Sequence, residues 1–149
     1  YNRIYAIEPN NKNFRKCINN LIDLNNIELY NAAVWSKDDT KYFSSDAGRQ
    51  GKLSEQGKPT RCRSIDSILG GEKCTYIKYD VEGAERQALL GSVGTIRNYS
   101  TKICTALYHR AYDIIDLPML IHEINPEYRM YLRQYAYYPA WETNLFCIK

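Results

Sequence analysis

The chain has 149 residues, of which 44% are hydrophobic and 25% are charged, so it can bury the core of one globular domain and is neither disordered nor fibrous. Twenty basic residues oppose 17 acidic ones, and with this balance we expect no nucleic-acid or membrane partner. No apolar run reaches the roughly 18 residues of a membrane-spanning helix. The five cysteines lack zinc-ligand spacing, which predicts no structural metal and favours a reduced, cytoplasmic compartment.

The first part of the chain predicts a strand, a helix and a second strand. The strand over residues 3–7 ends at Pro9, which cannot donate to a ladder, and Asn10 is a good helix cap. Apolar residues at helical spacing then predict an amphipathic helix of about four turns that ends by Leu24. Residues 27–35 form a largely apolar run, typical of a buried parallel strand.

The remaining sequence predicts a polar loop followed by alternating strands and helices, with Pro118 tolerated in the first turn of the last helix. The last two strands have no helix between them and should form an antiparallel hairpin at the sheet edge. We therefore predict an α/β fold with a mostly parallel sheet and helices on both faces. The expected elements are a loop over 36–60 with a short strand at 40–43, a helix over 64–69, a strand over 75–79, a helix ending near 90, a strand over 102–108, a helix over 116–124, and strands near 128–135 and 143–148.

Polar residues follow the predicted strands, at the edge where open α/β sheets bind ligands. Glu8 follows the first strand and could accept both hydrogen bonds of a ribose diol, although a carboxylate there also suits a plain helix cap. Asp80 follows an apolar strand, where a carboxylate needs a partner, and this favours a functional role. For Glu82 the functional interpretation and a simple helix-dipole interaction are equally good, whereas Glu85 fits a helix-surface or structural role better.

Candidate catalytic and substrate groups follow the fourth strand. His109 is one of only two histidines, and its imidazole could take a proton from a hydroxyl or be an ordinary rim histidine. Arg110 and Arg133 could hold an anionic or sugar-like substrate, although exposed arginines are common.

Several short motifs, in this order, resemble the FkbM family of class I S-adenosylmethionine-dependent methyltransferases. The resemblance implies that Glu8 binds the cofactor ribose, that Asn10 also belongs to the cofactor site, and that Asn31 and Ala32 lie near the adenine. The motifs are Glu8-Pro9-Asn10, Asn31-Ala32-Ala33-Val34, the segment 64–69, the segment 77–85 with Asp80-Val81-Glu82-Gly83-Ala84-Glu85, Tyr108-His109, and the closing segments 131–133 and 141–143.

The resemblance also assigns roles near the transferred methyl group. It implies that Asp80 lies by the methionine end of the cofactor, and that His109, with Glu82, faces the acceptor. The reaction it implies is O-methylation of a hydroxyl on a sugar or a secondary metabolite. His109 or Asp80 would remove the hydroxyl proton, and the protein would mainly align an in-line displacement.

One part of the family's pattern is missing. Methyltransferases of this class begin with a strand and a glycine-rich turn upstream of the Glu8 strand, and this sequence has neither. We therefore expect residues 1–149 to be a single unit, the C-terminal portion of a catalytic domain, that binds S-adenosylmethionine weakly or not at all. Calorimetry showing tight binding, at roughly micromolar Kd, would refute this.

Two other functions remain open at this stage. An acidic residue after a second strand also suits the ribose of a nicotinamide cofactor, so an NAD-dependent oxidoreductase is one alternative. A non-catalytic remnant or binding module that kept the fold is the other. We expect no bound metal, although Asp80, Glu82 and His109 could ligate Mg²⁺ in principle. Exposed tyrosines on the edge hairpin would allow a homodimer.

Overall fold

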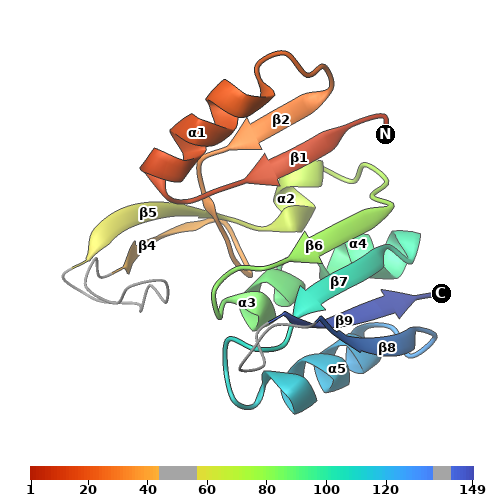
Figure 1. Cartoon of the computed structure of the whole chain (residues 1–149). Helices are drawn as coiled ribbons and strands as arrows, with labels where there is room; N and C mark the ends of the chain where they lie inside the picture. Colours follow the sequence, from red (N-terminus) through yellow and green to blue (C-terminus); the bar gives the residue numbers. More distant parts are fainter. Residues whose placement is uncertain (44–56, 136–141) are drawn as a thin grey trace.

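The computed structural model describes residues 1–43, 57–135 and 142–149, which form three β-sheets with helices packed around them (Figure 1). The predicted α/β class is confirmed. Part of the loop expected over residues 36–60 lies outside the described residues. Within the described ranges, no helix has both the length and the hydrophobicity needed to cross a membrane.

The chain begins with a parallel β-α-β unit. The side-chain oxygen of Asn10 accepts hydrogen bonds from the backbone N–H groups of Lys12 and Asn13, at 2.9 and 3.2 Å, and so caps the helix as predicted. The helix ends at Leu21, earlier than expected, where the Leu24 N–H closes a turn onto the Leu21 carbonyl. The elements are β1 (Ile4–Ile7), α1 (Asn11–Leu21) and β2 (Ile27–Tyr30).

The single strand expected over residues 27–35 is wrong. Strand β2 ends at Tyr30, and the chain leaves the ladder because the side-chain amide of Asn31, rather than a backbone N–H, donates to the Glu8 carbonyl at 2.9 Å. Strand β3 (Ala33–Val34) then joins a different sheet.

The second sheet has the order β3-β5-β4. The short strand expected at residues 40–43 is confirmed as β4 (Asp39–Phe43). Its antiparallel partner β5 (Lys58–Arg63) begins inside the segment expected to be loop. This strand was not predicted because Cys62 is its one buried residue, so the segment lacks the apolar alternation typical of a strand.

The third sheet has the order β6-β7-β9-β8 and carries the predicted antiparallel hairpin at its edge. One mostly parallel sheet is not confirmed by the described residues: antiparallel pairings are as frequent there as parallel ones, and no described strand pairs with both β1 and β6. The strands are β6 (Tyr76–Tyr79), β7 (Lys102–Ala106), β8 (Arg129–Gln134) and β9 (Thr143–Ile148).

Four short helices follow the first sheet. Ser64 caps α2 by accepting from the Ser67 N–H, as predicted. The segment between β6 and β7 holds two helices, of which the second was not predicted. The last helix starts earlier than expected, so Pro118 lies inside it rather than in its first turn. The helices are α2 (Ile65–Leu69), α3 (Glu85–Leu90), α4 (Val93–Tyr99) and α5 (Asp113–Ile124).

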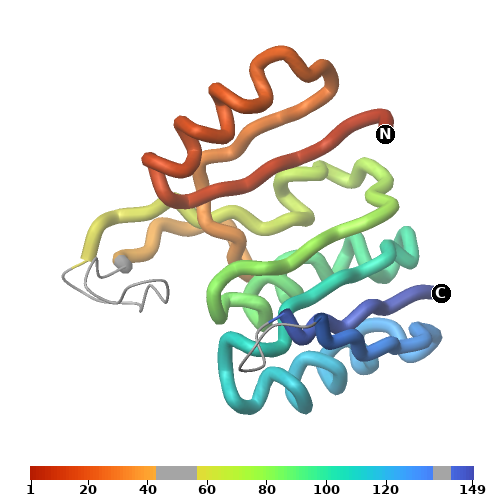
Figure 2. The backbone as a smooth tube through the Cα atoms, in the orientation of Figure 1, coloured from red at the N-terminus to blue at the C-terminus, as the bar shows by residue number. Residues whose placement is uncertain are grey.

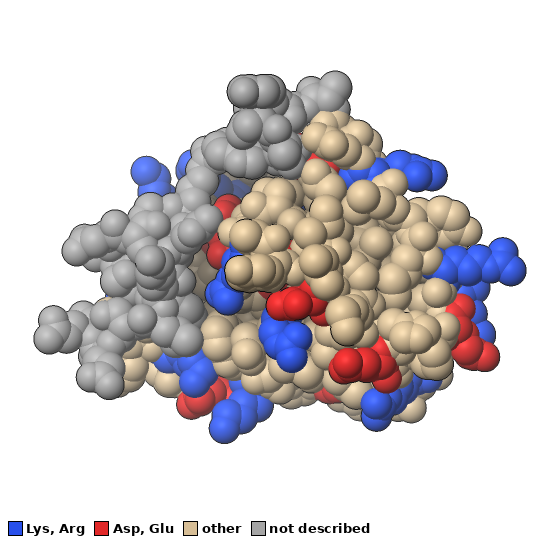
Figure 3. Space-filling model, turned by 90° about the horizontal axis from the view of Figure 1, so that it is seen from below, with Lys and Arg blue, Asp and Glu red and all other residues tan. Residues whose placement is uncertain are grey.

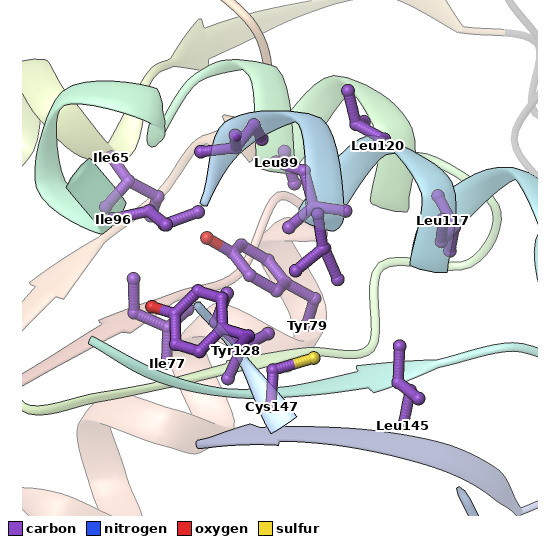
Figure 4. Packing of buried hydrophobic residues seen from close by; sticks show 14 of the residues in the cluster. Ile65, Ile77, Tyr79, Leu89, Ile96, Leu117, Leu120, Tyr128, Leu145 and Cys147 are labelled. Atoms are coloured by element: carbon purple, nitrogen blue, oxygen red, sulfur yellow. The ribbon is translucent and has the colours of Figure 1, made fainter. Parts of the chain in front are cut away.

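The hydrophobic core lies between the third sheet and helices α3, α4 and α5 (Figure 4). Tyr79 of β6 is fully buried there, and its hydroxyl shares a 2.6 Å hydrogen bond with Ser92 Oγ, so the buried polar atom is satisfied. Tyr76 and Lys78 alternate with the buried β6 residues and are exposed. The expected helical cover on both faces is therefore not found at β6, where the described helices pack against the Tyr79 face.

The arrows of β1 and β6 point the same way in Figure 1, and Figure 2 traces the same two strands in that orientation. They belong to separate sheets. The Glu72 carboxylate bridges the two units by accepting hydrogen bonds from Arg3 and from the Tyr5 hydroxyl. The carboxyl ends of β1, β2, β6 and β7 consequently face one side of the molecule.

Candidate active site at the carboxyl ends of the strands

The first group of predicted site residues lies where β1 and β2 end. The Glu8 side chain is half-buried, and its Oε1 accepts a 2.7 Å hydrogen bond from the Asn10 N–H. Asn31 donates from Nδ2 to the Glu8 carbonyl, so the two strand ends are tied together. Glu8, Asn10 and Asn31 therefore form one polar corner, with the Glu8 carboxylate fixed by its own loop.

Two of the predicted cofactor-binding residues, Asn10 and Ala32, have side chains that serve the fold. The Asn10 oxygen is occupied as the helix cap of α1. Ala32 is only 2% exposed, so its side chain belongs to the core. The predicted contacts of both residues with a cofactor stay predictions.

The second group lies where β6 ends. Asp80 is reached from both sides: Tyr108 donates its hydroxyl to Oδ1 at 3.1 Å, and Lys78 donates to Oδ2 at 3.3 Å. Burial, followed by the charge of Asp80 and the hydrogen bond to it, raises the pKa of the Tyr108 hydroxyl. The turn after Asp80 is tight, because Glu82 and Gly83 both have positive φ, of 52° and 93°.

The His109 ring is the centre of this second group. Its Nδ1 atom lies 2.6 Å from Oε1 of Glu85, and its Nε2 atom lies 3.5 Å from Oε2 of Glu82 and 3.7 Å from Oδ1 of Asp80. The ring also packs against that of Tyr108, with centroids 4.3 Å apart. Three of the carboxylates of the segment 80–85 thus surround one imidazole, whose side chain is only 6% exposed.

Burial and the neighbouring carboxylates act on the pKa of His109 in opposite directions. Burial on its own lowers the pKa of His109, but the hydrogen bond to Glu85 and the charges of Glu85, Glu82 and Asp80 outweigh burial and raise it above the ordinary value of 6.5. The protonated form of the ring is therefore favoured relative to a free imidazole.

Arg110 lies directly over the turn. Its Nε atom is 3.1 Å from the position that a Cβ at Gly83 would occupy, so glycine leaves room for the guanidinium. Its backbone N–H donates to Asp113 Oδ2 at 3.0 Å. Burial, and then the charge of Glu85, raises the pKa of Asp113. Arg110 thus lies beside the His109 group, and its predicted role in substrate binding stays a prediction.

Arg133 lies on the same sheet edge but farther along it. It pairs with Asn144 of β9, and Asn144 pairs with Ala106 at the end of β7. Its guanidinium donates to the neighbouring Leu132 carbonyl. Its predicted role in substrate binding stays a prediction.

Glu85 is the residue that the sequence reasoning missed. We expected a structural or surface group, whereas the side chain is 1% exposed and bonded to His109. Its position in α3 held the signal, because Ala88 and Leu89, three and four residues later, are both fully buried and mark the same helix face.

The remaining surface gives context to these groups. Among the described residues, no group of three or more metal-ligating side chains is arranged to hold a metal ion. On the face shown in Figure 3, basic and acidic side chains are interspersed around a broad uncharged area. An open hollow between α5 and β8 is lined partly by His122, Tyr128 and Met130, and it does not include the residues at the strand ends.

Comparison with known proteins assigns the fold and the family. The structure is similar to the crystal structure of methyltransferase FkbM from Methylobacillus flagellatus KT, with a TM-score of 0.78 and 26% sequence identity over 98% of this chain. This chain spans only 36% of that protein. Among curated proteins, no sequence matches significantly. Residues 1–139 match the family described as the methyltransferase FkbM domain. The chain therefore belongs to the FkbM methyltransferase family.

Proposed function

We propose that this protein is an S-adenosylmethionine-dependent methyltransferase that methylates a hydroxyl group of a sugar or a secondary metabolite. The observation that carries the proposal is the contact of His109 with carboxylates on both ring nitrogens, at the edge where α/β sheets bind ligands. Family membership supports methyl transfer, and the site supports the abstraction of a proton.

The residues at the strand ends fit the proposed cofactor. A ribose diol needs a hydrogen-bond acceptor, and the Glu8 carboxylate supplies one, since its Oε1 is held by the Asn10 N–H and this fixes the orientation of the group. The amino group of the methionine end needs a negative partner, and Asp80 is a partly exposed carboxylate. The cofactor supplies an activated methyl group bonded to a positively charged sulfur.

His109 acts as the general base. With the cofactor bound, its activated methyl group would pass to the acceptor oxygen, and Nε2 of His109 would take and hold the proton that this hydroxyl loses. Asp80 and Glu82 stabilise the resulting imidazolium, because their oxygens face Nε2 at 3.7 and 3.5 Å.

The sheet of the active protein contains one more strand. Among the described strands none pairs with both β1 and β6, although the two run in the same direction in Figure 1. A parallel strand between them would satisfy the facing edges and would bring its own turn beside Asp80. A protein as long as the relative could provide that strand, since this chain spans 36% of it. Residues 1–149 alone are then expected to bind the cofactor much more weakly than the longer protein.

The two histidines of the chain allow a matched test. In the intact protein, transfer of a radiolabelled methyl group from S-adenosylmethionine to a panel of mono- and oligosaccharides is measured for His109→Gln and for His122→Gln. His122 is exposed on α5, so its variant should keep wild-type turnover. The His109 variant should lose about 10²-fold or more in turnover. Equal turnover of the two variants would reject His109 as the base.

A further inference from the structure

We infer that Glu85 is a positioning residue that fixes the proton of the neutral His109 ring on Nδ1 and thereby directs Nε2 toward the acceptor hydroxyl. This inference rests on the proposed function for its catalytic consequence. Its structural content, the tautomer and orientation of His109, is independent of that function.

The geometry gives Glu85 one principal partner. Its Oε1 atom lies 2.6 Å from Nδ1 of His109 and also accepts a 3.0 Å hydrogen bond from the Val81 N–H. A carboxylate can only accept, so the ring nitrogen beside it must be the donor. The neutral imidazole then carries its proton on Nδ1, and Nε2 holds the lone pair.

The burial of Glu85 strengthens its interaction with the His109 ring. The side chain is 1% exposed, and Oε2 is buried with no hydrogen-bond partner among the described residues. No described Lys or Arg forms an ion pair with it. A buried carboxylate with so few partners interacts strongly with the one ionisable ring that it touches.

Other charged groups surround the ring and shape the same titration. Asp80 after β6 and Glu82 in the turn face Nε2, and the charge of His109 is felt by Asp113 of α5. Arg110 is the adjacent cation. Asp80 and Glu82 are about one third to one half exposed, whereas Glu85 is buried, so Glu85 dominates through its shorter contact and lower screening.

Nuclear magnetic resonance of the histidine rings tests the inference directly. Long-range proton–nitrogen spectra of the ¹⁵N-labelled intact protein report the tautomer and pKa of His109, with His122 in the same spectrum as an internal reference. The variants are Glu85→Gln and the matched control Glu123→Gln, which makes the same change at an exposed site on α5. Signals are assigned with His109→Gln and His122→Gln.

We expect the wild-type neutral ring of His109 to be protonated at Nδ1. In Glu85→Gln the pKa of His109 should fall below its wild-type value and the Nε2–H tautomer should become populated, with the His109 signals of Glu123→Gln unchanged. A wild-type ring protonated at Nε2, or a tautomer and pKa unchanged by Glu85→Gln, would overturn the inference. If Glu85→Gln does not fold, the wild-type tautomer decides alone.

Turnover separates this inference from the proposed function. Glu85→Gln should lower kcat on the order of 10²-fold and leave KM for S-adenosylmethionine within a few-fold, because Glu85 acts through His109. The kcat of wild type should rise with pH through the pKa of His109, and this rise should move to lower pH in Glu85→Gln. If His109→Gln keeps full turnover, the general base is refuted, while the spectra still decide the role of Glu85.

Discussion

The Tyr108 hydroxyl donates a 3.1 Å hydrogen bond to Oδ1 of Asp80 and so joins the carboxyl ends of β7 and β6. Removing this hydroxyl in Tyr108→Phe should lower the free energy of unfolding by about 1 kcal/mol, since a hydrogen bond to a charged acceptor is lost at a half-buried site. Urea unfolding measures the change. Tyr112→Phe, at a highly exposed tyrosine, is the control and should leave stability unchanged. Equal stabilities of the two variants would show that the bond does not contribute.

Asp66 is expected to be a main stabilising residue of the α2–α4 contact. Its carboxylate accepts hydrogen bonds from the backbone N–H groups of Gly94 and Thr95, at 2.9 and 2.8 Å, and from the Thr95 hydroxyl at 2.7 Å. Asp66→Ala should therefore destabilise the protein by about 2–3 kcal/mol. Thermal and urea unfolding check this against Asp23→Ala, an exposed aspartate. A loss as small as that of Asp23→Ala would contradict the capping role.

Gly91 should tolerate no side chain. A Cβ at this position would lie 2.0 Å from the Trp35 carbonyl oxygen, a backbone atom that cannot move aside alone. At Gly94 the nearest atom, 3.0 Å away, is the side-chain Oδ2 of Asp66. Gly91→Ala should cost about 3 kcal/mol or more, and Gly94→Ala clearly less. Denaturation midpoints of the two variants provide the comparison, and a reversed order would contradict the packing described.

The charge cluster around His109 predicts a pH-dependent contribution to stability. The folded-state pKa is raised above 6.5, so folding favours the protonated ring. This stabilisation is fully present below pH 6.5 and is lost as the pH rises through the folded pKa. The stability difference between wild type and His109→Gln should therefore shrink as the pH rises from below 6.5 through the folded-state pKa. Thermal melts of both proteins across this range test it, and a difference that grows with pH has the wrong sign.

Local signals predicted most of the elements. Asn10 and Ser64 begin helices as their capping preference indicates, and the closing hairpin forms where no helix separates two strands. The elements that differ from the prediction are set by tertiary contacts, which leave no pattern in the local sequence. Asn31 ends β2 by bonding to the Glu8 carbonyl 23 residues earlier, and β5 is held by pairing with β4 rather than by an apolar face.

The candidate site was likewise predicted only in part. The order of motifs placed Glu8, Asp80 and His109 at strand ends, because parallel strands with the same direction end at one edge. It did not reveal that Glu85 turns inward, since a carboxylate in a first helical turn also suits the helix dipole. The contact with His109 is made where α3 packs against α5, and it depends on tertiary structure rather than on the local sequence.

Cofactor binding is the most direct test of the central claim, because it needs no knowledge of the acceptor. Isothermal calorimetry of the intact protein with S-adenosylmethionine is compared for wild type, Glu8→Ala and the control Glu28→Ala, whose carboxylate on β2 instead contacts Arg3 and Tyr30. The account predicts binding by wild type, near-equal binding by Glu28→Ala, and a loss of about tenfold or more in Glu8→Ala. No binding by wild type, or equal affinity of wild type and Glu8→Ala, would contradict it.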